Sequence, residues 1–261
     1  ISLKKNEYDD ALFYFKKYVN LTSKVINKDK IRYGLALHKI AISSHGLKLF
    51  NDAISYNKKA VEFFKDNDYF IIGDVYRSLA HIYTDLVMID EAEATYLEAI
   101  LHYEKTLPDT DYEWLSARDD LADFYYKNEN YDESLVISYN ILNYYDEYLG
   151  GPQPHGCYNY NRLGLLEMHF QDYDLAEKIF LKMVEMYKEY KSDCFAAGFA
   201  NLGSLYQEQN KIDQAEEFFL KAIEVDNNSV INQDYDAYFR YADLLYDNEE
   251  RHLESGPLFL K

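Results

Sequence analysis

Apolar and polar positions follow one pattern that recurs along the chain. The stretch "QDYDLAEKIFLKMV" at 171–184 and the stretch "NKIDQAEEFFLKAI" at 210–223 agree at Asp, Ala, Glu, Phe, Leu and Lys. Neighbouring copies lie 39 or 42 residues apart, and their shared small residue is Ala11, Ala53, Ala92, Ser134, Ala176 or Ala215. A fixed period in this range is typical of repeat proteins, so we predict stacked copies of one structural unit.

Each shared small residue is expected to lie near the start of a helix. Two residues before it stands a side chain that can accept a hydrogen bond from a free N–H group of the first turn. These expected N-caps are Asp9, Asn51, Asp90, Asp132, Asp174 and Asp213. An apolar residue precedes each cap and can pack back on the helix. The pattern therefore predicts a helix that begins at each cap.

A second set of small residues predicts another helix in each copy. These residues lie twelve positions upstream, at Ala41, Ala80, Ala122, Gly164 and Gly203. Small side chains on both helices allow a close approach, and nearby aromatic residues can fill the remaining space. These aromatic residues are Tyr83, Tyr125 and Tyr206 on the first helix and Tyr96, Phe180 and Phe219 on the second. Each copy is therefore predicted to be a helical hairpin.

The pattern resembles the tetratricopeptide repeat, in particular the longer variety found in kinesin light chains. The resemblance is clearest at Leu202, Gly203, Tyr206, Ala215, Phe219 and Ala222, and the departures are Asn57 and Ser138 in place of an aromatic residue and Glu167 in place of a Tyr. The resemblance implies an all-α fold, a right-handed α-solenoid superhelix of tandem helix-turn-helix hairpins. The first helices would line its concave groove.

We expect a single array over residues 1–261. It would comprise a lone second helix at 6–28, hairpins at about 30–67, 69–107, 111–149, 155–191 and 193–227, and a partial hairpin at 232–261. In the last copy Leu253 stands at the cap and Ser255 at the small position. The apolar residues Leu258, Phe259 and Leu260 could support self-association through an exposed solenoid end.

Composition limits the classes of partner. The chain is 48% hydrophobic with 4 Pro and 10 Gly, which suits long helices, and its formal net charge is −19. This charge repels nucleic acid and anionic lipid, so neither is expected as a partner. No apolar run is long enough to span a membrane. Cys157 and Cys194 fit neither a disulfide framework nor a zinc site, and we interpret them as free thiols of a cytoplasmic protein.

The resemblance also implies which residues line the groove. The candidates for partner binding are His38, Lys39, Arg77, Ser78, His81, Asp119, Asp120, Asp123, Tyr126, Tyr158, Asn161, Arg162 and Asn201. The amides of Asn161 and Asn201 suit a ligand's peptide groups. The three carboxylates of residues 119–123 repel one another unless positive charge is near. That charge could come from a basic partner, or Arg77 and Arg162 could neutralise them.

No catalytic or cofactor motif emerges from the sequence. The histidines at 38, 45, 81 and 169 match no metal-ligand spacing, and Cys157 near His155 lacks a third orienting group. We therefore expect a scaffold that is not an enzyme, needs no cofactor and binds a peptide or protein segment in its groove. The alternative is a ligand-sensing or regulatory arm of a larger effector or signalling protein, with a protease, kinase or DNA-binding domain outside these residues.

Overall fold

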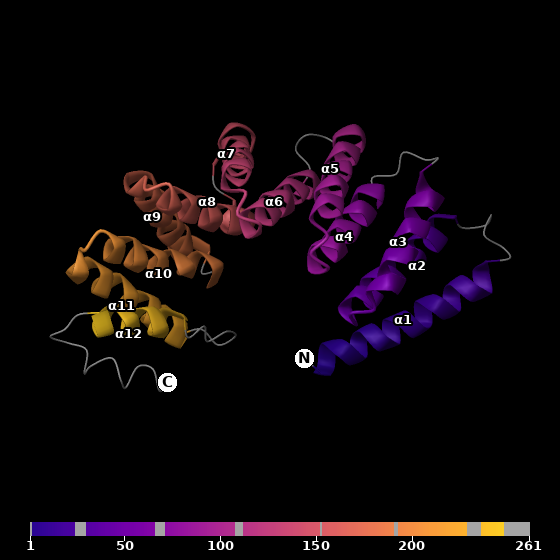
Figure 1. The fold of residues 1–261 in the computed structure, drawn as a ribbon, viewed down its shortest axis with the longest axis horizontal. Helices are drawn as coiled ribbons and strands as arrows, with labels where there is room; N and C mark the ends of the chain where they lie inside the picture. Colours follow the sequence, from indigo (N-terminus) through magenta and orange to yellow (C-terminus); the bar gives the residue numbers. More distant parts are fainter. Residues whose placement is uncertain are drawn as a thin grey trace. The chain divides into compact units, whose positions relative to one another are not determined.

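The chain folds into antiparallel α-helices, each packed against the next within its unit (Figure 1). The computed structural model describes residues 2–23, 30–65, 71–107, 112–151, 153–190, 193–228 and 236–247. Within these ranges it contains helices and no strand. None of the described helices has the length and apolar content needed to cross a membrane. The arrangement confirms the predicted all-α solenoid of helical hairpins.

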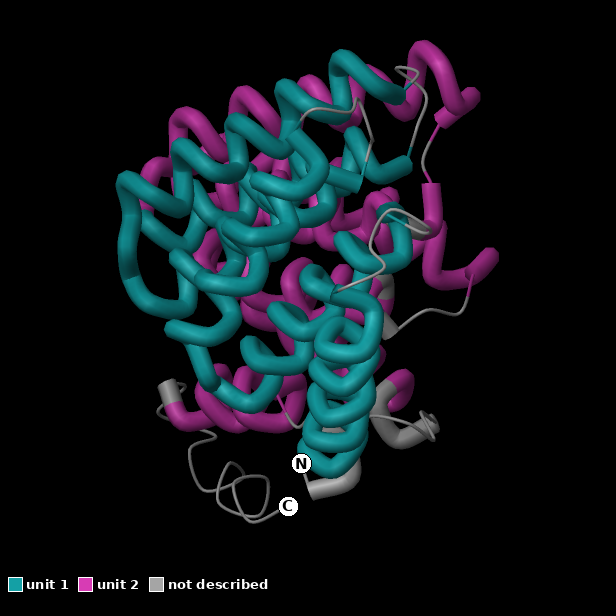
Figure 2. The backbone as a smooth tube through the Cα atoms, turned by 90° about the vertical axis from the view of Figure 1, so that its right-hand side faces the viewer, with its two compact units in different colours: residues 1–128 teal, residues 129–261 magenta. Residues whose placement is uncertain are grey.

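The chain divides into two compact units, residues 1–128 and 129–261 (Figure 2). Unit 1 contains α1 (Ser2–Thr22), α2 (Lys30–Gly46), α3 (Phe50–Phe64), α4 (Ile71–Asp85), α5 (Ile89–Thr106) and α6 (Tyr112–Lys127). Unit 2 contains α7 (Tyr131–Tyr148), the 3-10 helix η2 (Pro154–Gly156), α8 (Cys157–His169), α9 (Tyr173–Tyr190), α10 (Asp193–Glu208), α11 (Ile212–Asn228) and α12 (Asp236–Asp247). The even-numbered helices are first helices of hairpins and the odd-numbered ones are second helices.

The expected ranges differ from the helices mainly at the two ends of the chain. The lone second helix was expected at 6–28, whereas α1 runs from Ser2 to Thr22. The partial hairpin at 232–261 contributes α12, while Leu253, Ser255 and the apolar residues 258–260 lie outside the described residues. The boundary between the units falls between α6 and α7, inside the expected hairpin 111–149. A single array through both units stays a prediction.

Close helix packing depends on small residues that face aromatic rings. Ala41, Ala80 and Ala122 are fully buried on the first helices, as are Phe180 and Phe219 on the second helices. A Cβ atom added at Gly203 would lie 2.6 Å from the ring of Phe219, closer than real side chains approach. The ring therefore occupies the space that glycine leaves open, which is the physical reason for the repeat pattern.

Tyr–Glu hydrogen bonds join neighbouring hairpins. Tyr125 donates to Glu93 and Tyr206 donates to Glu177, each at 2.6 Å. Burial and this carboxylate raise the pKa of Tyr206 to about 12. At the fourth hairpin the roles reverse, because Tyr139 on the second helix donates to Glu167 on the following first helix. Glu167 departs from the repeat pattern, yet the same kind of contact is preserved.

The predicted N-caps are wrong by two residues. The amides of Ala53, Ala92, Ser134, Ala176 and Ala215 donate to carbonyls four residues earlier, so the predicted caps from Asn51 to Asp213 already lie in the first turn. Leu49, Met88 and Asn130 hold the cap positions of α3, α5 and α7, without a capping hydrogen bond from their side chains. At α9 the side chain of Asp172 accepts from the amide of Leu175 at 3.1 Å. Asp9 lies inside α1.

The backbone of each hairpin turn explains the shift. The residue before each cap position has a left-handed conformation, at Lys48, Val87, Glu129, Gln171 and Asn210, with φ between 57° and 63°. In the first hairpin the amides of Lys48 and Leu49 donate to the carbonyls of His45 and Ser44, which is the Schellman motif that ends a helix. The turn is therefore short, and the second helix of each hairpin begins one residue before the Asp or Asn that was predicted to cap it.

The cysteines contradict the free-thiol interpretation. Cys157 at the start of α8 and Cys194 near the start of α10 form a disulfide, with their Cα atoms 6.1 Å apart. Their separation of 37 residues is close to one repeat, and successive first helices pack side by side, so their N-terminal ends meet. The argument for a reducing, cytoplasmic location is lost, because disulfides persist in oxidising compartments.

Reducing this disulfide should destabilise unit 2. Closing a loop of 37 residues removes unfolded-state entropy worth about 4 kcal/mol of unfolding free energy. Urea denaturation with and without dithiothreitol would measure the loss. The variant Cys157→Ser/Cys194→Ser should show the same loss without reductant and no response to it. Equal urea midpoints for the parent and this variant in the absence of reductant would contradict the disulfide.

Val87→Gly should stabilise unit 1. Val87 is a β-branched residue with φ 58° and 75% of its surface exposed, so its side chain is strained at this turn and packs against little. Removing the Cβ should raise the unfolding free energy by about 1 kcal/mol, measured by urea denaturation. The matched control is Asn210→Gly, with φ 57°, where the gain should be smaller because Asn tolerates this conformation. A less stable Val87→Gly protein would refute the strain.

Candidate functional site

Predicted groove positions on successive first helices contact one another within each unit. In unit 1 Arg77 on α4 forms an ion pair with Asp120 on α6. In unit 2 the Nδ2 atom of Asn201 on α10 donates to Oδ1 of Asn161 on α8 at 2.6 Å. These positions therefore share one surface in each unit, which we call the first-helix face.

Arg77 organises the first-helix face of unit 1. Its guanidinium on α4 donates to Glu113 at 2.9 Å, to Ser116 at 2.7 Å and to Asp120, all on α6. His81 contacts the same Asp120 carboxylate at 3.2 Å. Although burial opposes it, the hydrogen bond from His81 and the charge of Arg77 hold the pKa of Asp120 below its usual value.

The acidic cluster of residues 119–123 is partly neutralised from within. Arg77 supplies a positive charge to Asp120, which was one of the two interpretations open at the sequence level. Asp123 pairs with Lys127 at 2.6 Å on its own helix. Asp119 and Tyr126 are half-buried. Two of the three carboxylates therefore have cationic neighbours in unit 1 without a partner protein.

His38 is a buried polar contact and does not lie on an accessible face. Only 5% of its surface is exposed, and Nδ1 lies 3.0 Å from the amide oxygen of Asn57. Asn57 in turn donates to Ser78 on α4 at 3.2 Å. Burial lowers the pKa of His38 and keeps the ring neutral near pH 7. Contact between His38 and a partner stays a prediction, and the burial of the ring leaves little of its surface for a ligand to reach.

Arg162 is also buried, with 4% of its surface exposed. Its guanidinium donates to Ser138 Oγ on α7 at 3.1 Å and to Asn159 Oδ1 at 3.0 Å. Asn57 and Ser138 stand at the repeat position where other copies have an aromatic ring. Asn57 bonds to Ser78, and Ser138 bonds to Arg162. Ser78 and Arg162 hold equivalent positions, two residues before the small residues Ala80 and Gly164. The sequence analysis missed these partnerships, although each departure stood opposite a polar side chain.

A row of polar side chains crosses the first-helix face of unit 2. Arg240 on α12 donates to Ser204 Oγ at 3.0 Å and to Asn201 Oδ1 at 3.4 Å, and Asn201 donates to Asn161. Arg240 is also held by Asp236 at 2.6 Å. Sequence reasoning missed Arg240, although it precedes Ala242 by two residues, as Asn201 precedes Gly203. We call Asn161, Asn201, Ser204 and Arg240 the amide row.

The remaining candidates differ in how accessible they are. Lys39 on α2 is exposed, and Tyr158 on α8 exposes 70% of its surface. Ser78 and Asn161 are half-buried, whereas Asn201 is 3% exposed. The side chain of His81 is 43% exposed. Tyr158 and Asn161 lie three residues apart on one face of α8, so their side chains are neighbours.

The histidines and cysteines have other contacts. The ring of His169 lies 4.3 Å from the ring of Tyr131, and Cys157 is held in its disulfide. In the part of the chain that the structure describes, no three His, Cys, Asp or Glu side chains are grouped to hold a metal ion. These side chains serve packing and electrostatic contacts between helices.

Comparison with known proteins supports this description. Residues 157–228 match the tetratricopeptide-repeat family. A search of curated protein sequences finds no match. Among solved structures, repeats of a kinesin light chain-like protein from Podosopora anserina are 14% identical with a TM-score of 0.62, covering 76% of this chain and 96% of that one.

Two further structures share the fold. A tetratricopeptide-repeat protein from Parabacteroides merdae is 18% identical with a TM-score of 0.65, covering 87% of this chain and 77% of that one. A signal-transduction ATPase with a tetratricopeptide-repeat sensor from Pyrococcus horikoshii is 18% identical with a TM-score of 0.70, covering 99% of this chain and 40% of that one. Residues 157–228 thus match the tetratricopeptide-repeat family, and the fold of the chain is similar to that of the kinesin light chain-like repeats.

Proposed function

We propose that this protein is an interaction scaffold that holds an extended segment of a partner protein against the first-helix face of unit 2. The tetratricopeptide fold generally supports protein interaction and is typical of non-catalytic scaffolds. The proposal of a binding site on unit 2 depends on the hydrogen bonding of the Asn161 side-chain amide. Its oxygen accepts from Asn201, while in the described structure its nitrogen donates to no other group. That nitrogen can donate to a carbonyl of a bound peptide.

The surroundings of Asn161 favour such binding. Arg240 holds Asn201, and Asn201 fixes the orientation of Asn161, so little conformational freedom would be lost on binding. The disulfide ties together α8 and α10, the two helices that carry the asparagines. Tyr158 adds an exposed ring one turn away from Asn161. An exposed aromatic side chain beside a fixed amide suits a peptide side chain and its backbone together.

Unit 1 offers a less available surface. Asp120 is already neutralised by Arg77, and His38 is buried, so fewer of its predicted groove residues can meet a partner. Asp119 and Asp123 remain candidates for contact with a basic partner, which would have to compete with Lys127 at Asp123. The similarity to the archaeal sensor is one of fold alone, and we do not favour the sensor alternative over the scaffold.

Truncating Tyr158 and Asn161 should weaken peptide binding. Peptides selected from a random library on the parent protein would be labelled, and their Kd measured by fluorescence polarisation. We expect Tyr158→Ala/Asn161→Ala to raise Kd by about thirtyfold, because an aromatic contact and an oriented amide are lost together.

The matched control is Asn140→Ala/Leu220→Ala. It truncates an amide and an exposed apolar side chain on the second helices α7 and α11. This variant should bind within about twofold of the parent, since few contacts outside the central site carry binding energy. Circular dichroism would show that both variants remain helical. Selected peptides that bind all three proteins equally would refute a site at the amide row.

A further inference from the structure

Two second helices of unit 1 carry lysine pairs at equivalent repeat positions. Lys16 and Lys17 follow Ala11 by five and six residues, and Lys58 and Lys59 follow Ala53 by the same intervals. The corresponding pairs in the other second helices are Leu97 and Glu98, Tyr139 and Asn140, Leu181 and Lys182, and Leu220 and Lys221. At this repeat position, two adjacent lysines therefore occur in α1 and α3 and in none of the other four second helices.

Lys16 of α1 and Lys59 of α3 converge on one aromatic ring of α3. The ammonium groups of Lys16 and Lys59 lie 5.7 Å and 4.8 Å from the ring centre of Tyr56. Lys16 also pairs with Asp52 at 3.2 Å, and Lys58 lies 6.0 Å from the ring centre of Tyr83. Cation–π contacts hold ammonium groups near aromatic faces but leave their charge unneutralised. We call Lys16, Lys58 and Lys59 the basic cluster.

Two of these three cations lack an anion. Among the described residues, neither Lys58 nor Lys59 forms an ion pair with a carboxylate. The nearby Glu62 is already paired with Lys65. Like charges held close together repel one another, so a carboxylate brought to this place gains attraction from both lysines.

An open hollow of about 720 Å³ lies beside the basic cluster. Its described lining comes from α3. The apolar residues are Ile54 and Phe63, which are half-buried, and the others are Asn51, Ser55, Lys58, Lys59 and Glu62, whose carboxylate is paired with Lys65. Such a surface can accept one apolar side chain while its rim contacts charged or polar groups. Both requirements are met by a short stretch of acidic polypeptide that contains a large aliphatic residue.

The distribution of charge decides between possible anionic ligands. Residues 1–65 contain 13 of the 27 Lys and Arg residues and only 6 of the 46 Asp and Glu residues. The remainder of the chain is therefore strongly acidic. Screening over about 8 Å at physiological salt shields a short ligand from that remainder. A membrane or nucleic acid presents negative charge over a wider area and would be repelled by the acidic remainder.

We propose that the outer face of α3, with Lys16 of α1, docks an acidic segment of a partner protein through one aliphatic anchor and flanking carboxylates. The anchor lies between Ile54 and Phe63, and the carboxylates contact Lys58 and Lys59. This surface belongs to second helices of unit 1, so it is separate from the amide row of unit 2. An experiment on this surface of α3 can therefore fail or succeed whether or not a peptide binds at Asn161.

A labelled peptide in which Asp and Glu residues surround a single Leu would test the proposal. Fluorescence polarisation should detect its binding to the parent protein, with an affinity that falls as salt concentration rises. Lys58→Glu/Lys59→Glu should raise Kd at least about tenfold, because attraction becomes repulsion. Replacing the Leu of the peptide with Ser should also weaken binding, since the hollow then receives no apolar side chain.

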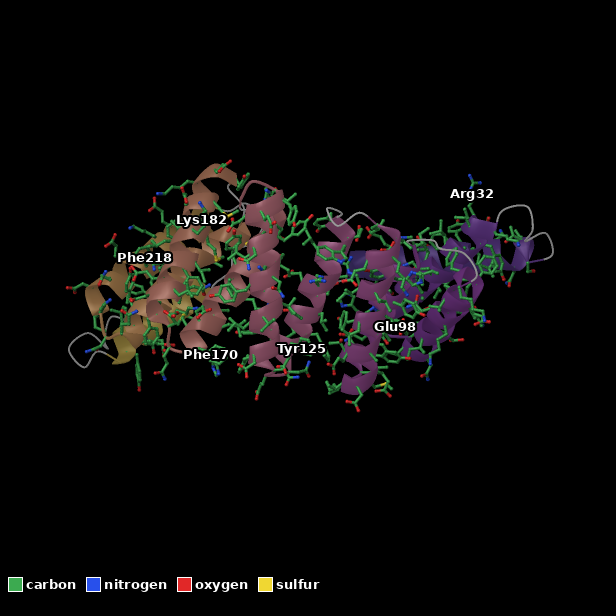
Figure 3. The ribbon with its side chains drawn as sticks, turned by 90° about the horizontal axis from the view of Figure 1, so that it is seen from above. Arg32, Glu98, Tyr125, Phe170, Lys182 and Phe218 are labelled. Atoms are coloured by element: carbon green, nitrogen blue, oxygen red, sulfur yellow. A yellow bond between two sulfur atoms is a disulfide. The ribbon has the colours of Figure 1, made fainter. Side chains whose placement is uncertain are left out.

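The matched control is Lys182→Glu/Lys221→Glu. It makes the same change in net charge at lysines of the second helices α9 and α11 (Figure 3 labels Lys182). This variant should bind the peptide within about threefold of the parent, because Lys182 and Lys221 belong to unit 2 and do not line the hollow on α3. Circular dichroism would confirm that both variants are folded.

Several results would overturn the proposal. The labelled peptide could fail to bind the parent protein, or the two charge-reversal variants could weaken its binding equally. Tighter binding of the parent to vesicles of phosphatidylserine and phosphatidylcholine, or to duplex DNA, would assign the cluster to another class of anion. Sedimentation that shows self-association of the parent, abolished by Lys58→Glu/Lys59→Glu, would identify a second copy as the occupant.

Discussion

The packing of a ring against a residue with almost no side chain sets the spacing of the hairpin helices. At Gly203 a single added carbon would collide with Phe219, and fully buried alanines hold comparable places in the earlier hairpins. Side chains also bond between successive first helices, as Arg77 of α4 does with α6 and Asn201 of α10 does with α8.

Where the ring is missing, polar side chains take over its function of filling space. Asn57 and Ser138 are fully buried, and each forms hydrogen bonds with a residue of the following first helix. A buried amide or hydroxyl costs free energy unless it is bonded, so these substitutions require their partners Ser78 and Arg162. The same requirement removes His38 and Arg162 from the surface available to a ligand. Tyr158 and Asn161 are among the positions that packing leaves accessible, which is why the proposed peptide contact lies there.

The sequence predicted the helices well because small and aromatic residues recur at fixed intervals and act locally. It misplaced the caps because the turn before each second helix has a left-handed residue of no recognisable type, including Val87 and Gln171. The disulfide escaped notice because Cys157 and Cys194 become neighbours only when two repeats stack. Neutralisation of Asp120 by Arg77 was one of two alternatives that the sequence left open, because the two residues belong to different hairpins. Arg240 was missed because the last copy matched the pattern incompletely.

The disulfide also has a mechanical consequence. A force that pulls on the two ends of unit 2 is transmitted through the bond from Cys157 to Cys194, so the 37-residue interval it closes carries no tension. That interval would span about 130 Å if fully extended. Helices α8 and α9 lie within it and are shielded from the load, whereas α7, α11 and α12 lie outside. Stretching would therefore unravel unit 2 from its margins and leave α8 and α9 as the last helices to lose their order.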